Sequence, residues 1–135
     1  MPSGATTAVD LLAKIFKNTA LPWDAITDIY VAFHTANPTA AGNQTSSEAN
    51  YTGYARVAIT RAGGGWSGTN PLANAALVQF GICSAGTNTL TYVSVGTASS
   101  GAGQILAYGA LNSPLAVSTG IQPQFAIGAL TIAMT

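Results

Sequence analysis

The sequence predicts an all-β protein: a jelly-roll-type antiparallel β-sandwich of about eight strands, with a short N-terminal α-helix. Apolar residues recur with a helical period in one stretch only, near the N-terminus. The rest of the chain divides into short strand-like runs at intervals of about 8–15 residues, separated by turns rich in Gly, Pro, Asn and Ser. A chain of 135 residues is long enough to bury a core as one domain.

We expect residues 1–20 to form an N-terminal arm and a short amphipathic helix, and residues 21–135 to form a single sandwich domain. The helix is predicted over Ala8–Lys17, where Thr7 can cap its start, with Asp10 in the capping-box position. Asp10 and Lys14 are spaced to form an i, i+4 ion pair. The apolar stripe of this helix consists of Val9, Leu12, Ala13 and Phe16.

The first strand is predicted over Ile29–Thr35. Its alternating pattern places Ile29, Val31 and Phe33 on the core face and His34 on the opposite, outer face. Residues 36–53 lack an apolar period and are expected to form a long ordered loop. The remaining strands are expected at Tyr54–Arg61, Ala76–Ile82, Thr89–Thr97, Gln104–Leu111, Leu115–Ser118 and Gln124–Met134, separated by turns at residues 63–65, 70–71, 86–88, 99–103, 112–114 and 120.

Charge is scarce and unevenly distributed. Only 6% of the residues are charged and the net charge is zero, whereas an ordinary domain is about 25% charged. All eight charged residues lie between Asp10 and Arg61. Without a basic excess the chain is not expected to bind nucleic acid. Without a basic amphipathic face or a long apolar run, no membrane partner is expected.

Few residues are suited to catalysis or metal binding. His34 could act as a catalytic base, but the sequence contains no Gly-x-Ser-x-Gly motif that would supply the nucleophile. Cys83 lies in an apolar run typical of a buried hydrophobic residue. Asp24 and Asp28 are four residues apart, but Asp24 is better explained as a helix cap. The scattered acids do not form a metal-ligand set. We therefore predict a protein that is not an enzyme and that has no catalytic, metal or cofactor site.

Several side chains are candidates for contact with a partner. Leu12 and Phe16 lie on the helix stripe, and four aromatic residues lie in or beside loops, where they either anchor a partner or cover the ends of the sandwich. Arg56 can stack on Tyr54 or pair with an acid. The candidate interface residues are Leu12, Phe16, Trp23, Tyr51, Tyr54, Arg56 and Trp66.

These features leave three classes of function open. A charge-poor surface with small residues and aromatic anchors favours a structural protein that packs against other protein chains. A sandwich with Trp, Tyr, Asn and Asp side chains could alternatively bind sugars. A small hydrolase is the least favoured, because its nucleophile and base are not apparent.

Several motifs point to a family. The runs at residues 29–38, 42–45, 51–58, 95–103 and 121–123 together resemble small virion proteins of tailed bacteriophages. The resemblance extends over most of the chain from about residue 20. Proteins of this type are described either as capsid decoration (cement) proteins with a jelly-roll fold or as tail-fibre-associated proteins.

The resemblance implies a non-enzymatic virion protein, made in the bacterial host cytoplasm and placed on the outer surface of the phage head. There it would clamp neighbouring major capsid protein subunits and stabilise the shell, and it would also contact itself as a homodimer or homotrimer. The alternative is a tail or tail-fibre protein with a role in binding host-surface glycans. In either case the N-terminal arm and helix could dock on a neighbouring subunit, or the helix stripe could pack on its own sandwich.

Overall fold

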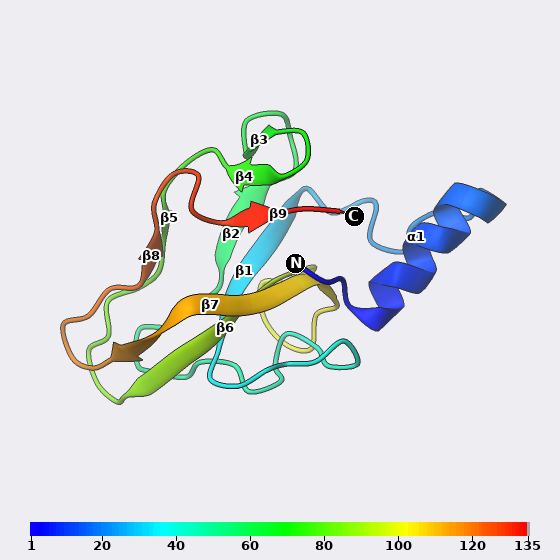
Figure 1. Ribbon diagram of the computed structural model, residues 1–135. Coiled ribbons are helices and arrows are strands. Elements are labelled where there is room, and N and C mark those ends of the chain that lie inside the picture. The colour runs from blue at the N-terminus through cyan, green and yellow to red at the C-terminus, as the bar shows by residue number, and fades with distance from the viewer. Residues whose placement is uncertain (135) are drawn as a thin grey trace.

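The fold of residues 1–134, which a computed structural model describes, confirms the predicted all-β sandwich with antiparallel sheets and a short N-terminal helix (Figure 1). A four-stranded sheet has the order β2-β1-β6-β7, a three-stranded sheet has the order β3-β4-β9, and β5 pairs with β8. The elements are α1 (Ala5–Lys17), β1 (Asp28–His34), β2 (Val57–Thr60), β3 (Trp66–Gly68), β4 (Leu72–Asn74), β5 (Val78–Gln79), β6 (Asn88–Gly96), β7 (Ile105–Val117), β8 (Gln124–Phe125) and β9 (Thr131–Ile132).

The core lies between the four-stranded sheet and the shorter strands that cover it. Phe33 of β1 lies 4.4 Å from Phe80 and 5.3 Å from Phe125, measured between ring centroids. Val31, Leu90, Val93 and Val95 are buried on the same side of the sheet, together with Val78 and Leu130 from the covering layer. Cys83 is buried in this core, as its apolar surroundings in the sequence predicted.

Helix α1 begins earlier than predicted, and Thr7 does not cap it. The N-cap is Gly4, which has no side chain to donate or accept a bond. Thr7 instead lies within the helix, and its buried hydroxyl donates to the carbonyl of Ile105 in β7 at 2.7 Å. Asp10 does not complete a capping box or pair with Lys14, because its carboxylate accepts hydrogen bonds from Trp23 and Gln104.

Strand β1 is buried on both faces, which corrects the prediction that His34 lies on an outer face. Val31 and Phe33 point into the core, while Ala32 and His34 are completely buried on the other side. The loop that follows β1 covers them: the Thr35 N–H donates to the carbonyl of Ser47, and the Ala49 N–H donates to that of Phe33. Alternation alone could not show that a loop would cover the polar face.

Two predicted strands, Gln104–Leu111 and Leu115–Ser118, are one continuous strand, β7. Its partner β6 shifts register between Leu90, which faces Leu115, and Tyr92, which faces Ala110. The excess residues form a bulge around Pro114, and the missing N–H of a proline is tolerated where the ladder is unpaired. The predicted turn at residues 112–114 is therefore wrong.

The other strands differ from prediction mainly in length. Strands β2, β5, β8 and β9 are shorter than their predicted runs, and the predicted strand Gln124–Met134 is two strands with a turn between them. Strands β3 and β4 are not among the predicted strands. Trp66, expected in or beside a loop, begins β3, which forms a hairpin with β4 around the predicted turn at Asn70-Pro71. Residues 36–53 form the expected long loop.

The N-terminal arm pairs with its own sheet. Ser3 forms a bridge with Ala107, and the Tyr108 N–H donates to the carbonyl of Pro2 at 3.0 Å. The arm thus lies along β7, the outer strand of the four-stranded sheet. Beyond it α1 projects away from the sheets (Figure 1).

Candidate assembly interface

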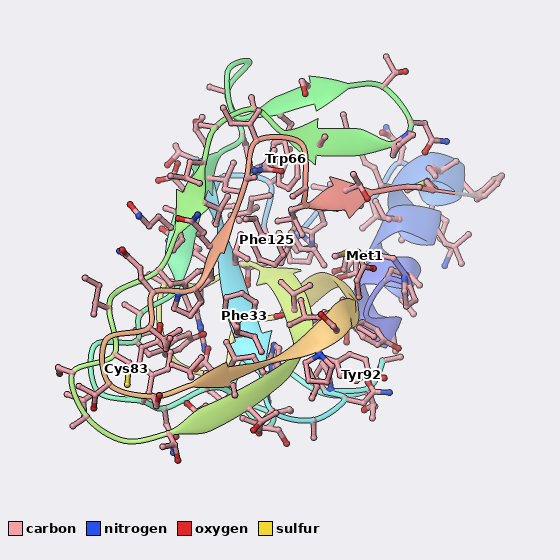
Figure 2. All side chains as sticks on the ribbon, turned by 60° about the vertical axis from the view of Figure 1, so that its left-hand side comes forward. Met1, Phe33, Trp66, Cys83, Tyr92 and Phe125 are labelled. Carbon is pink, nitrogen blue, oxygen red and sulfur yellow. The ribbon has the colours of Figure 1, made fainter. Side chains whose placement is uncertain are left out.

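The apolar stripe of α1 faces solvent. Four large apolar side chains of the helix are exposed, namely Val9 (66%), Leu12 (57%), Ile15 (65%) and Phe16 (78%). They lie on a helix that projects away from the sheets in Figure 1, and in Figure 2 this helix stands at the edge of the molecule beside Met1. Exposed apolar side chains that gather in one place mark a contact surface for another molecule. We call Val9, Leu12, Ile15 and Phe16 the α1 apolar face.

The first turns of α1 are held firmly to the body. Besides the Thr7 bond to Ile105, the Gln104 side chain donates to the Thr7 hydroxyl at 2.8 Å and to Asp10 at 3.0 Å. A Cβ added at Gly4 would lie 2.3 Å from the Ile105 oxygen, so only glycine permits this approach. The body therefore fixes the direction in which the helix projects.

Trp23 also holds the helix, through the same Asp10 carboxylate that Gln104 contacts. Its indole N–H donates to Asp10 at 3.2 Å, and the Arg61 guanidinium lies 5.5 Å from its ring centroid. Arg61 also donates to the carbonyls of Asp24 and Ile26, at 3.0 and 2.8 Å. Trp23 and Arg61 thus hold the segment that returns from α1 to β1, and Trp23 is half-buried by these contacts.

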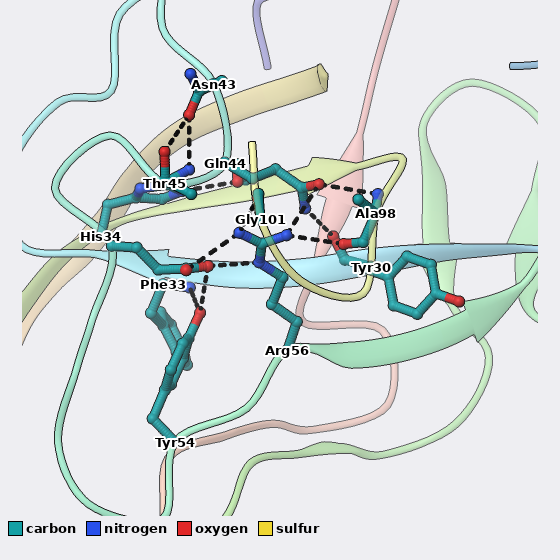
Figure 3. A network of polar contacts seen from close by, with 12 residues as sticks. Tyr30, Phe33, His34, Asn43, Gln44, Thr45, Tyr54, Arg56, Ala98 and Gly101 are labelled. Carbon is teal, nitrogen blue, oxygen red and sulfur yellow. Dashed lines mark hydrogen bonds and ion pairs between the residues drawn. The ribbon is translucent and has the colours of Figure 1, made fainter. Parts of the chain in front are cut away.

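Arg56 is the centre of a polar network at one end of the four-stranded sheet (Figure 3). Its side chain is 2% exposed and pairs with Glu48 through two bonds, at 2.5 and 3.1 Å. It also donates to the carbonyls of Ala98 at 2.9 Å and Gly101 at 2.7 Å. One buried cation therefore joins the loop after β1 to the loop between β6 and β7.

Gln44 fills the space beside this ion pair. Its amide nitrogen donates to the Tyr30 carbonyl, and its oxygen accepts from the Ala98 N–H. A Cβ added at Gly96 or Gly103 would come within 2.2 or 2.0 Å of this buried side chain. The glycines therefore leave room for a polar side chain that the sequence did not reveal as important.

His34 forms a buried pair with Ser94. The Ser46 carbonyl lies 2.7 Å from Nδ1, so Nδ1 carries the hydrogen, and the Ser94 hydroxyl then donates to Nε2, also at 2.7 Å. The arrangement resembles a nucleophile and base. However, both side chains are completely buried, so a substrate has no access to the hydroxyl.

We expect His34 to make stability depend on pH. Burial lowers its pKa below the usual 6.5, and the nearby Arg56 acts in the same direction, against the opposing Ser46 carbonyl and Glu48. Because the unfolded chain binds the proton more readily, stability is full above about pH 6.5 and falls as the pH decreases below that value. Urea unfolding between about pH 5 and 8 should show this slope, and His34→Gln should flatten it. If the stability of the wild type and of His34→Gln depended equally on pH, His34 would not be the group responsible.

Residues 1–134 contain no group of three or more His, Cys, Asp or Glu side chains placed to hold a metal ion. Their one helix is too short to cross a membrane. A groove of about 390 Å³ lies at the base of α1, lined by Met1, Leu11, Leu106, Ile132 and Met134 among others. This groove is largely apolar and adjoins the helix.

Comparison with known proteins identifies the family. A family model described as podophage GP4 fiber I protein gp80 matches residues 3–133. The chain belongs to this family. No curated protein matches it. The match confirms the predicted resemblance to phage virion proteins, and its description agrees better with the tail-fibre alternative than with capsid decoration. It specifies neither the head surface nor a clamp on the major capsid protein.

In this gp80-family protein the predicted interface residues occupy three separate places. Leu12 and Phe16 lie together on the α1 apolar face, with Trp23 at the base of the helix. Tyr51, Tyr54 and Arg56 gather around the core and the polar network instead: the rings of Tyr51 and Tyr54 meet edge to face at 5.6 Å, and Tyr51 is buried. Trp66 is half-buried at the start of β3.

The inward residues have structural tasks. The Tyr54 hydroxyl donates to Glu48 and accepts from the Phe33 N–H, and burial raises the Tyr54 pKa far above its usual value. The Tyr51 hydroxyl donates to the Gly81 carbonyl at 2.9 Å. Tyr51, Tyr54 and Arg56 therefore make contacts within the subunit, and their role in an interface with a partner stays a prediction. Arg56 pairs with Glu48, which was one of the two predicted alternatives for this residue.

Proposed function

We propose that the protein is a non-enzymatic structural subunit of a podophage fibre, and that it joins the fibre through the α1 apolar face. One observation carries the proposal: a helix anchored at its base presents four large apolar side chains to solvent. Such a surface gains free energy when a partner covers it, because apolar area leaves water. The family match to a phage fiber protein supplies the context for that partner.

The buried chemistry supports a structural role. His34 and Ser94, the pair closest to a hydrolase site, are enclosed by the loop after β1. Two of the aromatic residues on which sugar binding would depend are also used internally, since Tyr51 and Tyr54 bond to Gly81 and Glu48, and Trp23 and Trp66 are half-buried. The contacts of these residues favour assembly over both catalysis and glycan binding.

The test is incorporation into virions. A phage that lacks this gene would be complemented with the wild-type protein or with the double variant Leu12→Gln, Phe16→Gln, and purified particles would be assayed for the subunit. We expect the double variant to reduce incorporation by at least about tenfold, since each lost apolar contact weakens binding exponentially.

The matched control is the double variant Lys14→Gln, Lys17→Gln. It introduces the same two residues into the same helix at exposed positions outside the apolar face, and glutamine and lysine have similar helix propensities. This control should be incorporated like the wild type. Normal incorporation of the Leu12 and Phe16 variant would refute the interface, and electron microscopy that located the subunit on the head shell would refute the fibre assignment.

A further inference from the structure

We infer that the partner of the α1 apolar face is α1 of a second copy of this chain, packed antiparallel. The inference deepens the proposed function, on which it rests, by naming what covers the face. Three features of the helix point to a second copy: the side it presents, the spacing and charge of the residues on that side, and their sizes.

Val9, Leu12 and Phe16 of the α1 apolar face lie on the side of the helix opposite to the body, and Ile15 flanks them. Thr7 and Leu11 define the inner side, because Thr7 bonds to Ile105 and Leu11 lines the groove beside Leu106. With about 100° of rotation per residue, Val9, Leu12 and Phe16 lie about half a turn away from that side. A second helix can therefore approach without meeting the sheets of the same subunit.

The spacing on this side is that of a coiled-coil seam. The exposed residues Ala5, Val9, Leu12 and Phe16 are separated by four, three and four positions, which is the alternation of a and d positions in a heptad. The flanking e and g positions are all uncharged, namely Thr6, Ala8, Ala13 and Ile15. Asp10, Lys14 and Lys17 fall at outer positions, so two identical helices meet without like charges opposed.

The sizes of the seam residues favour the antiparallel arrangement. In that arrangement small Ala5 of one copy faces large Phe16 of the other, and Val9 faces Leu12. Every layer then has a similar volume, whereas parallel helices would place two Phe16 rings in one layer and two Ala5 methyls in another. Matched volumes pack without voids or strain. The two-fold axis makes the same face serve both copies, and the helix dipoles oppose each other.

The first test measures mass in solution. Analytical ultracentrifugation at about 100 μM should give the mass of a dimer for the wild-type chain and for the double variant Lys14→Gln, Lys17→Gln. The dissociation constant of the dimer should be at least about tenfold higher for the double variant Leu12→Gln, Phe16→Gln. Circular dichroism would show that each variant remains folded. A wild-type chain that is monomeric at this concentration, or a dimer unaffected by the Leu12 and Phe16 changes, would overturn the inference.

The second test measures orientation. A spin label attached to the cysteine of the Lys17→Cys variant reports the distance between the outer ends of the two helices. The other cysteine, Cys83, is buried, and the unaltered chain serves as the control for labelling at that residue. Antiparallel packing separates these ends by about 20 Å along the helix axis, whereas parallel packing brings them side by side. The shorter distance would overturn the arrangement. If the chain is monomeric but the Leu12 and Phe16 variant still fails to enter virions, the proposed function stands and the second-copy inference fails.

Discussion

Replacing Arg56 with alanine is expected to reduce the free energy of unfolding by about 3 kcal/mol, because the change leaves the largely buried Glu48 carboxylate without its counter-ion. The Arg56 side chain is 2% exposed and that of Glu48 is 19% exposed. The variant also loses the bonds from Arg56 to the Ala98 and Gly101 carbonyls, so the contacts of Gln44 with Ala98 and Gly103 are left to join the two loops. Urea unfolding monitored by tryptophan fluorescence would measure the loss.

Arg61→Ala is the matched control for this prediction. Arg61 pairs with Asp24 at 3.4 Å through side chains that are 30% and 62% exposed, and exposed ion pairs contribute at most about 1 kcal/mol. Arg61→Ala also removes the bonds to the Asp24 and Ile26 carbonyls and the contact with Trp23, so we expect a measurable loss of stability that is smaller than that of Arg56→Ala. The double variant Arg56→Met, Glu48→Met should recover part of the lost stability, because it removes both charges and supplies apolar volume. If the two arginine variants were equally stable, the network would not be the support that its geometry indicates.

Phe80→Ala is expected to reduce the free energy of unfolding by about 3–5 kcal/mol, the usual cost of removing a buried aromatic ring. Phe80 is almost completely buried, and its ring lies against Phe33 and stacks on Tyr54 at 6.0 Å between centroids. The cavity would therefore open between the four-stranded sheet and the layer above it. Thermal and urea unfolding would both detect this loss.

Leu77→Ala provides the comparison for Phe80. Leu77 lies three residues away and is substantially exposed, so its truncation should change stability by no more than about 0.5 kcal/mol. Similar losses for the two variants would mean that Phe80 does not connect the layers as described.

The sequence was sufficient for features that depend on neighbouring residues. The single helix, most of the turns, the burial of Cys83 and the strand β6 follow from local periodicity and turn chemistry. It was insufficient where a distant segment determined the outcome. Thr7 has a side chain suited to a helix cap, but its hydroxyl donates instead to the carbonyl of Ile105, 98 residues further along the chain. Pro114 is a turn former in isolation, yet here it occupies a bulge that β6 defines.

The candidate interface was predictable to the same degree. The stripe with Leu12 and Phe16 was visible as a period, but only the structure shows that these side chains are exposed to solvent. The aromatic residues Tyr51 and Tyr54 were ambiguous because loops can either display a ring or bury it. Gln44 and Ser94 carried no signal, since a buried polar side chain is recognised only by the partners that satisfy it.

The pairing of the N-terminal arm with β7 has a consequence for solubility. Strand β7 is 13 residues long, contains no charged residue and forms the edge of its sheet. An uncharged edge of this length offers free N–H and C=O groups to other chains and invites aggregation. The bonds of Pro2 and Ser3 occupy one part of that edge, and Pro114 with its bulge interrupts another. A protein almost without charge thus protects its longest strand by covering and interrupting it instead of by repulsion.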